Sequence, residues 1–356
     1  MSRVQGHRRR AWLVAVAAVA ALLTGCTPLT AIDQRALVLA LAFDVGNCPG
    51  GIRATAQWYG SPPSLALRGS ERAESQSACG DDVDNAVERL REHAKRYLDF
   101  GVTNLILIGS QLARQVQPTV DLVWREGELP ETAQVMVVDG QAAEVLLDAQ
   151  DENAFLLYTR SIDSQASNTA MTPMTLWRFE GRRWGLPGDA WAPVIAMAGS
   201  TVRSRGVALF DHGHLATILE GRPAAAFGWL TKIGGYSDVD LSGPHMPNAS
   251  IGLRVLSRGL RRTCVGGLPV VDLTLRTRLR AGDTVRLRGR DDRGLQRIAS
   301  EVAWQDVSTA IRSGLAAGSD PVGLRSMGCV AHSADALPTR LQLRVHVQIQ
   351  PDEREA

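Results

Sequence analysis

Short apolar runs alternate with segments of helical periodicity, and this alternation limits the fold class more than any other feature. Ala36–Val45, Asn104–Gly109 and Gln134–Val138 are apolar runs of strand length. Between the first two runs, residues 81–98 place apolar side chains at helical spacing, and residues 141–149 do so after the third. Strands that alternate with helices build α/β sheets. The sequence therefore predicts an α/β fold with mixed sheets.

Two hairpins and a late strand–helix–strand region complete the predicted elements. Residues 46–51 are rich in turn formers and lead to a returning strand at 52–59. The polar stretch 61–80 is expected to be a loop. A second hairpin is predicted over residues 202–219. The remaining predicted elements are a helix at 222–231, strands at 250–260 and 268–280, a helix at 295–315 and a strand at 339–349 that alternates strictly.

The order of these elements predicts three consecutive domains after a leader. Residues 1–25 are predicted to be a lipoprotein signal peptide. Residues 26–150 form the N-terminal α/β domain, residues 151–235 a middle domain with a hairpin and helices, and residues 236–356 a C-terminal α/β domain. A stretch rich in Ser, Gly and Pro begins near Gly234 and supports the second boundary.

The N-terminus has the organisation of a lipoprotein signal. Residues 1–10 are polar and basic, and Ala11–Leu23 is an apolar run. This run is shorter than the roughly 20 residues of a membrane-spanning helix and suits a signal peptide. Leu23-Thr24-Gly25-Cys26 matches the bacterial lipobox. Cys26 is therefore expected to carry acyl chains, palmitate among them, that tether the mature chain to the outer face of a membrane. An ordinary secretory signal that happens to contain a cysteine is the alternative.

Four further cysteines follow, and an even number outside the cytosol permits disulfide bonds. Three pairings are open, and domain order favours Cys48 with Cys79 and Cys264 with Cys329. The alternative is four unpaired thiols. Because no two cysteines have the CxxC spacing, a zinc site is not expected.

The sequence does not indicate an enzyme, a cofactor or a nucleic-acid partner. It lacks the Gly-x-Ser-x-Gly elbow, the P-loop, the GxGxxG turn and the HExxH motif. The formal net charge of +2 lacks the basic surplus of a nucleic-acid binder. His212 and His214 could hold a metal from one face of a strand, but both lie in a predicted turn and no third ligand is near. No catalytic and no metal-binding residue is therefore predicted.

The assembled segments resemble the Ger(x)C family, the lipoprotein C subunits of spore germinant receptors. Residues 32–44 resemble the opening strand of the family, which ends in Asp, and residues 105–109 resemble its next strand, which ends in Gly. Residues 206–219 are similar to the hairpin that begins with Gly, and residues 320–324 to an Asp-containing segment after the long helix. Their order and spacing, more than any single motif, support the resemblance.

The resemblance implies a non-enzymatic subunit of three α/β domains. Such a subunit would act in spore germination with an integral-membrane A subunit and a multi-span B subunit, anchored in the spore inner membrane. A solute-binding lipoprotein of a transporter is the alternative, but it would need two similar lobes, and the element pattern does not repeat. An extracytoplasmic enzyme is a third hypothesis, for which no catalytic set is visible.

Overall fold

The computed structural model describes most of the chain between residues 34 and 350. The described residues are 34–46, 51–59, 73–115, 129–148, 174–184, 186–199, 201–231, 238–241, 251–280, 292–329 and 341–350. The elements are β1 (Arg35–Val45), β2 (Ile52–Tyr59), β3 (Ala73–Gly80), α2 (Val83–His93), β4 (Tyr97–Asp99), β5 (Leu105–Gly109), α3 (Ser110–Gln115), β6 (Gln134–Val138), α5 (Ala142–Asp148), α7 (Leu176–Trp184), β7 (Trp191–Ala198), β8 (Thr201–Asp211), β9 (His214–Glu220), α8 (Gly221–Thr231), β10 (Val239–Asp240), β11 (Gly252–Val265), β12 (Leu268–Leu279), α10 (Asp292–Ala316) and β13 (Gln342–Ile349).

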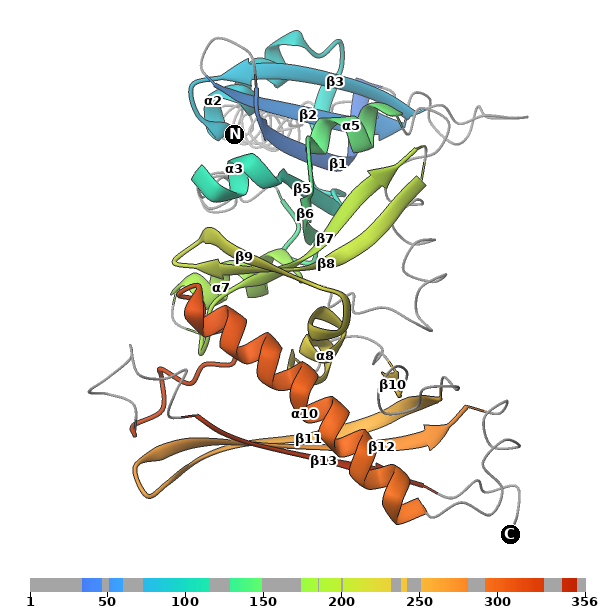
Figure 1. The fold of residues 1–356 in the computed structure, drawn as a ribbon. Helices are drawn as coiled ribbons and strands as arrows, with labels where there is room; N and C mark the ends of the chain where they lie inside the picture. Colours follow the sequence, from blue (N-terminus) through green and yellow to red (C-terminus); the bar gives the residue numbers. More distant parts are fainter. Residues whose placement is uncertain are drawn as a thin grey trace, which may run out of the picture. The chain divides into compact units, whose positions relative to one another are not determined.

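The first nine strands form one mixed sheet (Figure 1). The strand order is β3-β2-β1-β5-β6-β7-β8-β9, and β4 also pairs with β1. The pairs β1–β5, β5–β6 and β6–β7 at the centre are parallel. Antiparallel pairs flank them on both sides. The α/β class with mixed sheets, predicted from the sequence, is confirmed.

The central strands of this large sheet are covered on both faces. Every residue of β5 is buried. Leu107 packs into a cluster with side chains of α5, whereas Ile106 and Ile108 belong to a cluster on the other face that includes side chains of α2 and α3. Burial on both faces explains why these strands have continuous apolar sequences.

A second sheet, in the order β10-β11-β12-β13, carries the C-terminal part of the chain. The long helix α10 lies across one face of it (Figure 1). α10 also covers the edge of β13, because the Val347 N–H donates to Ser300 Oγ at 2.9 Å and Trp304 Nε1 donates to the Leu343 carbonyl at 3.1 Å. These bonds occupy polar groups that an open sheet edge would expose.

Two segments differ from the sequence expectation. Residues 73–80, expected within a loop, form β3, which pairs with β2. Its sequence has only small and polar side chains, so the strand has no apolar alternation to reveal it. The first helix ends at His93 because Ala94 is extended, and residues 97–99 form β4 instead of continuing the helix to residue 98.

The large sheet also spans a predicted domain boundary. β6 and β7 lie on opposite sides of residue 150, and they pair in parallel through Val137 with Val194 and Val138 with Ile195. The segments 26–150 and 151–235 therefore contribute strands to one sheet, and the three-domain division stays a prediction.

The predicted second hairpin is present as β8 and β9. Its turn places His212 at φ 48° and Gly213 at φ 85°. Two successive positive φ angles are those of a type I′ turn, whose twist suits a tight hairpin. The preference of Gly for this geometry explains why the turn was readable from the sequence.

In the part of the chain that the structure describes, no helix combines the length and apolar character needed to cross a membrane. The signal peptide at 1–25 and the lipobox Cys26 lie outside the described residues. Acylation of Cys26 therefore stays a prediction.

Candidate functional site

The buried Asp44 carboxylate joins the end of β1 to the start of α5. Asp44 is only 2% exposed. Its Oδ1 accepts a hydrogen bond from the Ala142 N–H at 2.6 Å, and its Oδ2 accepts one from the Ala143 N–H at 2.8 Å. A Cβ atom on Gly109, at the end of neighbouring β5, would lie 2.2 Å from Asp44 Oδ1. Asp44 and Gly109 each end a strand segment that resembles the family, and in the structure they pack directly against each other.

The same contacts limit what Asp44 can do chemically. Burial raises the pKa of Asp44 above its ordinary value, and the hydrogen bonds from Ala142 and Ala143 oppose that change. Both carboxylate oxygens accept backbone hydrogen bonds that link the end of β1 to the start of α5. Asp44 positions the helix α5 at this edge of the sheet.

Gly206 is a second family-like position with a steric role. It lies in β8 opposite Glu220 of β9. A Cβ atom on Gly206 would lie 1.9 Å from the Leu219 carbonyl oxygen. Only glycine lets the two backbones approach this closely. The glycine of the hairpin motif therefore serves strand packing.

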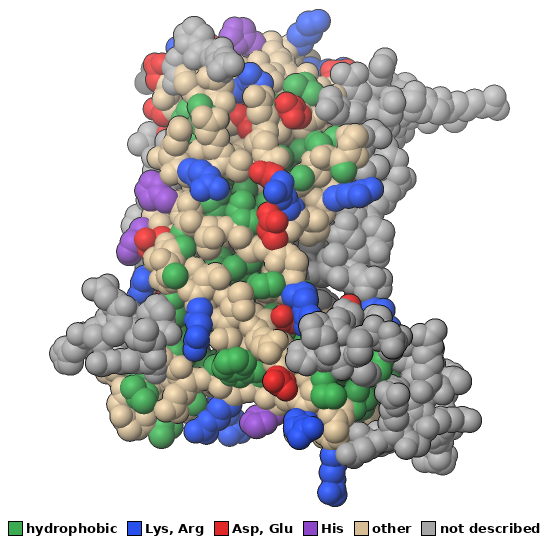
Figure 2. Space-filling view, in the orientation of Figure 1, with side chains coloured by type: hydrophobic (Ala, Val, Ile, Leu, Met, Phe, Trp, Pro, Cys, Tyr) green, Lys and Arg blue, Asp and Glu red, His purple; other side chains and the backbone are tan. Residues whose placement is uncertain are grey.

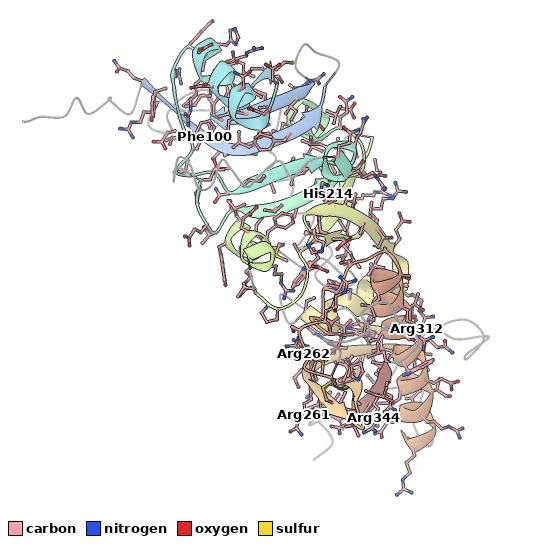
Figure 3. The ribbon with its side chains drawn as sticks, turned by 90° about the vertical axis from the view of Figure 1, so that its left-hand side faces the viewer. Phe100, His214, Arg261, Arg262, Arg312 and Arg344 are labelled. Carbon is pink, nitrogen blue, oxygen red and sulfur yellow. A yellow bond between two sulfur atoms is a disulfide. The ribbon has the colours of Figure 1, made fainter. Side chains whose placement is uncertain are left out.

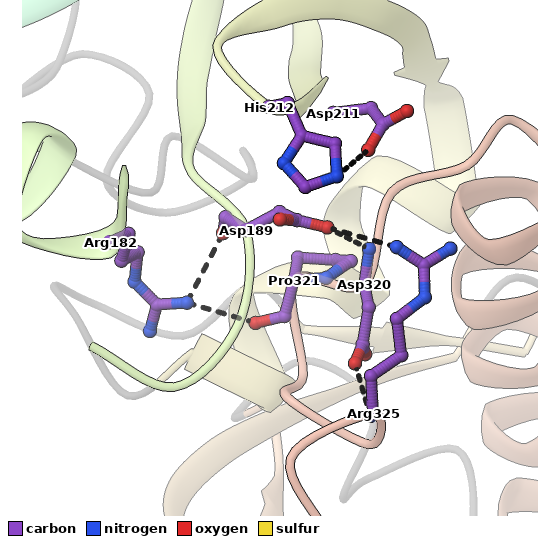
Figure 4. Close-up of polar contacts among 7 residues, drawn as sticks. All are labelled: Arg182, Asp189, Asp211, His212, Asp320, Pro321 and Arg325. Atoms are coloured by element: carbon purple, nitrogen blue, oxygen red, sulfur yellow. Dashed lines mark hydrogen bonds and ion pairs between the residues drawn. The ribbon is translucent and has the colours of Figure 1, made fainter. Parts of the chain in front are cut away.

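A polar network fixes the segment after α10 to the loop before β7 (Figure 4). The Asp320 N–H donates to Asp189 Oδ2 at 2.5 Å, and the Arg325 N–H donates to Asp320 Oδ2 at 2.6 Å. Arg325 Nη1 lies 3.9 Å from the same Asp189 oxygen. Burial raises the pKa of Asp320 above its ordinary value, with backbone hydrogen bonds from Arg325 and Leu324 acting in the opposite direction.

Two arginines hold the same segment from other elements. Arg182 of α7 donates through Nη1 to the carbonyls of Asp189 at 3.2 Å and Pro321 at 3.1 Å, and its Cζ lies 4.0 Å from the Trp191 ring centre. Burial, with repulsion from Arg262, lowers the pKa of Arg182 to about 10. Arg262 of β11 donates to the Val322 carbonyl. Charged side chains here act as clamps on backbone carbonyls.

A disulfide closes the far end of this segment. Cys264, near the tip of β11, is bonded to Cys329, with a Cα–Cα distance of 5.9 Å. Cys79 is also disulfide-bonded. Cys48, the expected partner of Cys79, and the lipobox Cys26 lie outside the described residues.

Neither a metal site nor an activated nucleophile is present in the described residues. No group of three or more His, Cys, Asp or Glu side chains there could hold a metal ion. His212 occupies the turn, where its side chain is 88% exposed, so it does not share a strand face with His214. Ser319 is fully buried, and within the described segments its hydroxyl has no hydrogen-bond partner that could act as a base.

Sequence reasoning found only part of this network. Asp320 lies in a segment quoted for the family resemblance, but Arg182, Asp189 and Arg262 do not. They come from α7, a loop and β11, and no spacing in the sequence connects them. A buried arginine that bonds backbone carbonyls leaves no recognisable motif, so no signal could have found these residues.

The comparisons with known proteins agree with the family resemblance. Residues 30–197 match the spore germination protein N-terminal domain. The fold is similar to the crystal structure of the GerBC protein, with a TM-score of 0.51 and 14% sequence identity, over 87% of this chain and 97% of that one. No curated protein matches the chain. The matched domain contains Asp44 and Gly109, which pack against each other as described above. Residues 30–197 therefore carry the spore germination protein N-terminal domain, in agreement with the resemblance to the Ger(x)C family.

Proposed function

We propose that this chain is the lipid-anchored C subunit of a spore nutrient germinant receptor, and that it works with integral-membrane A and B subunits by binding and not by turnover. The match of residues 30–197 to the spore germination protein N-terminal domain carries the proposal. The lipobox ending at Cys26 supports an anchor at the outer face of the spore inner membrane.

The chemistry of the family-like positions favours a binding role. Both carboxylate oxygens of Asp44 and the Oδ2 of Asp320 accept hydrogen bonds from backbone N–H groups. Gly109 and Gly206 allow close approaches. Residues used in this way maintain a shape. A catalytic centre would instead direct such groups toward a shared reacting position.

A solute-binding lipoprotein is the weaker candidate. That architecture would need two similar lobes, whereas one sheet here has nine strands with a parallel centre and the other has four strands in a different order. The two sheets do not repeat each other.

Co-purification from detergent-solubilised spore membranes tests the proposed complex. An affinity-tagged chain is expected to recover both A and B subunits. Tethering confines the chain to the membrane plane and raises its effective concentration there, so a modest contact can hold the complex. Recovery of a transporter, or of no membrane protein, would contradict the proposed role.

Metabolic labelling with a radioactive fatty acid tests the anchor separately. Cys26→Ala is expected to abolish labelling and leave the chain unprocessed or released from the membrane fraction. Thr27→Ala is the matched control, since it leaves the lipobox intact and should label normally. Equal labelling of both variants would contradict acylation at Cys26.

A further inference from the structure

The C-terminal sheet has one face that α10 does not cover, and arginines gather on it. The residues that face α10, such as Leu253, Leu273 and Val345, are buried. Their neighbours along each strand point the opposite way. We name this opposite side the arginine face, and its cationic residues are Arg254, Arg261, Arg276, Arg278 and Arg344. Arg261 and Arg344 lie on this sheet in Figure 3, and basic side chains gather along the lower edge of Figure 2.

The strand register brings these arginines together with few acids. Arg254 is directly opposite Arg278. Arg261 and Arg344 flank Asp272 from the two neighbouring strands, and Arg344 Nε lies 3.9 Å from the Asp272 carboxylate. His346, also exposed, is the next residue on this side of β13 after Arg344. Like charges that lie directly opposite each other destabilise a sheet. The Arg254–Arg278 pair therefore lowers stability unless an anion from outside the chain offsets the repulsion.

Most of this positive charge has no partner among the described residues. In the described segments, Arg254, Arg261 and Arg276 form no ion pair or hydrogen bond with another side chain, and the shielded Nε of Arg278 has no hydrogen-bond partner. Asp240 of β10 and the preceding Asp238 lie at the border of the sheet, where Asp238 is paired with Arg280. The surplus is local, because the whole chain has a formal net charge of only +2.

The spacing of the arginines fits a surface with many anions. They are spread over three adjacent strands. Neighbouring strands of a sheet lie about 4.8 Å apart, and successive residues on one side of a strand lie about 6.6 Å apart. A guanidinium group binds phosphate oxygens in pairs through its planar fork. Among the described residues, this face has no cluster of acids or of apolar side chains that would form a pocket. Leu256 and Val265 are the exposed large apolar side chains of β11. An extended array of phosphates therefore fits better than a single small ligand.

We infer that the arginine face docks on the anionic phospholipid headgroups of a membrane. Charge complementarity supports this occupant, because basic clusters bind anionic lipid with about 1 kcal/mol, or about fivefold, for each cation near the surface. The choice of a lipid surface over an acidic protein rests on the proposed anchoring at Cys26. Docking would hold the C-terminal sheet against the bilayer by a contact separate from the acyl chains.

Vesicle flotation tests the inference on the full chain with Cys26→Ala, so that no acyl chain contributes. The vesicles are phosphatidylcholine alone or phosphatidylcholine with about 30% phosphatidylglycerol, an anionic lipid. The parent chain is expected to float more strongly with the anionic vesicles than with phosphatidylcholine alone, because the retained apolar leader contributes to both. Removing four cations with Arg254→Gln, Arg261→Gln, Arg276→Gln and Arg344→Gln should lower its partition coefficient roughly tenfold or more.

A matched variant removes the same charge elsewhere. Arg114, Arg203, Arg297 and Arg312 are exposed and lie off the arginine face. Their replacement by Gln is expected to lower partitioning less than threefold or so, because only cations near the lipid contribute strongly. The basic residues before the apolar leader run are common to every variant. Circular dichroism shows whether each variant folds.

Three results would overturn the inference. The parent chain could show no preference for anionic vesicles, or the two fourfold variants could lose equal amounts of vesicle binding. The third is binding that persists unchanged at about 1 M salt, where the Debye length falls to about 3 Å. Binding of the parent to an acidic protein of the spore membrane without binding to anionic vesicles would assign the face to a protein partner instead. Labelling of Cys26 is measured separately, so failure of the anchor and failure of the arginine face are distinguishable.

Discussion

The two sheets of this chain bury different numbers of faces. The large sheet packs side chains on both sides of its parallel centre, where Ile106 and Leu107 point into different clusters. The C-terminal sheet packs only one side against α10 and leaves the arginine face exposed. The difference is visible in single strands, since β5 is buried throughout whereas β13 alternates between exposed and buried residues.

Charged side chains have different surroundings in the two sheets. In the large sheet, charged side chains such as Asp44 are buried and bonded to backbone groups. In the C-terminal sheet, charged side chains such as Arg261 and Arg276 stand in solvent without a partner among the described residues. The central strands of the large sheet have no free face, whereas the arginine face of the C-terminal sheet is open to a partner.

Removing the disulfide should strongly lower stability, and the loss should arise in the C-terminal sheet. Replacing Cys264 and Cys329 together by Ser opens a link with a sequence separation of 65. On the chain-entropy view this lowers the free energy of unfolding by about 4 kcal/mol. Denaturant unfolding of the oxidised parent and the double variant measures the difference. Equal midpoints and two free thiols in the parent would show that the bond does not form.

Truncating one side chain in each sheet tests the burial contrast directly. Leu107→Ala should lower the free energy of unfolding by about 2–5 kcal/mol, because it leaves a cavity between β5 and α5. Gln348→Ala, on the exposed side of β13, should change it by less than about 0.5 kcal/mol. Chemical denaturation of both variants makes the comparison. Similar losses would mean that the C-terminal sheet is covered on both faces.

Replacing one glycine by alanine in each sheet should give a smaller difference in stability between the two sheets. In Gly109→Ala the new Cβ would lie 2.2 Å from Asp44 Oδ1, and the clash should cost about 1–3 kcal/mol. In Gly259→Ala the nearest atom is the Thr274 Cβ at 4.0 Å, so stability should hold or rise by up to about 1 kcal/mol. Thermal unfolding followed by circular dichroism reports both. A destabilising Gly259→Ala would place an unexpected neighbour over the exposed side.

The smallest expected effect is a pH dependence at Asp320. Burial raises the pKa of Asp320 in the folded chain, so the folded state binds this proton more tightly than the unfolded state. The stability that Asp320 contributes is then present at low pH and declines as pH rises through the folded pKa. Relative to Asp320→Asn, the parent should lose stability progressively as pH rises above the ordinary Asp pKa of about 4. A relative gain with rising pH would show that the hydrogen bonds outweigh burial.

Elements with strong local patterns were predictable from the sequence. The continuous run of β1, the helix α10 and the alternating strand β13 were all expected near their observed positions. β3 was not, because small polar residues such as Ser75 and Ser77 have no apolar period and the strand exists through pairing with β2. Pairing partners far apart in the chain, such as β6 and β7, were likewise invisible to a local reading.

The candidate sites were likewise predictable only where the signal was local. Asp44 and Gly109 could be singled out by resemblance, but their contact with each other could not. The arginine face was hidden for a different reason. Its members lie on three strands, and only the register between these strands brings Arg261, Asp272 and Arg344 side by side. Sequence reasoning had no means to predict that register.

Germination of a deletion strain tests the proposed role as a receptor subunit most directly. It is followed as the fall in optical density of a spore suspension across a panel of nutrients. Spores without the chain are expected to lose the response to the nutrients of one receptor, and the wild-type gene should restore it. A deletion strain that responds to every nutrient at the wild-type rate would contradict the claim.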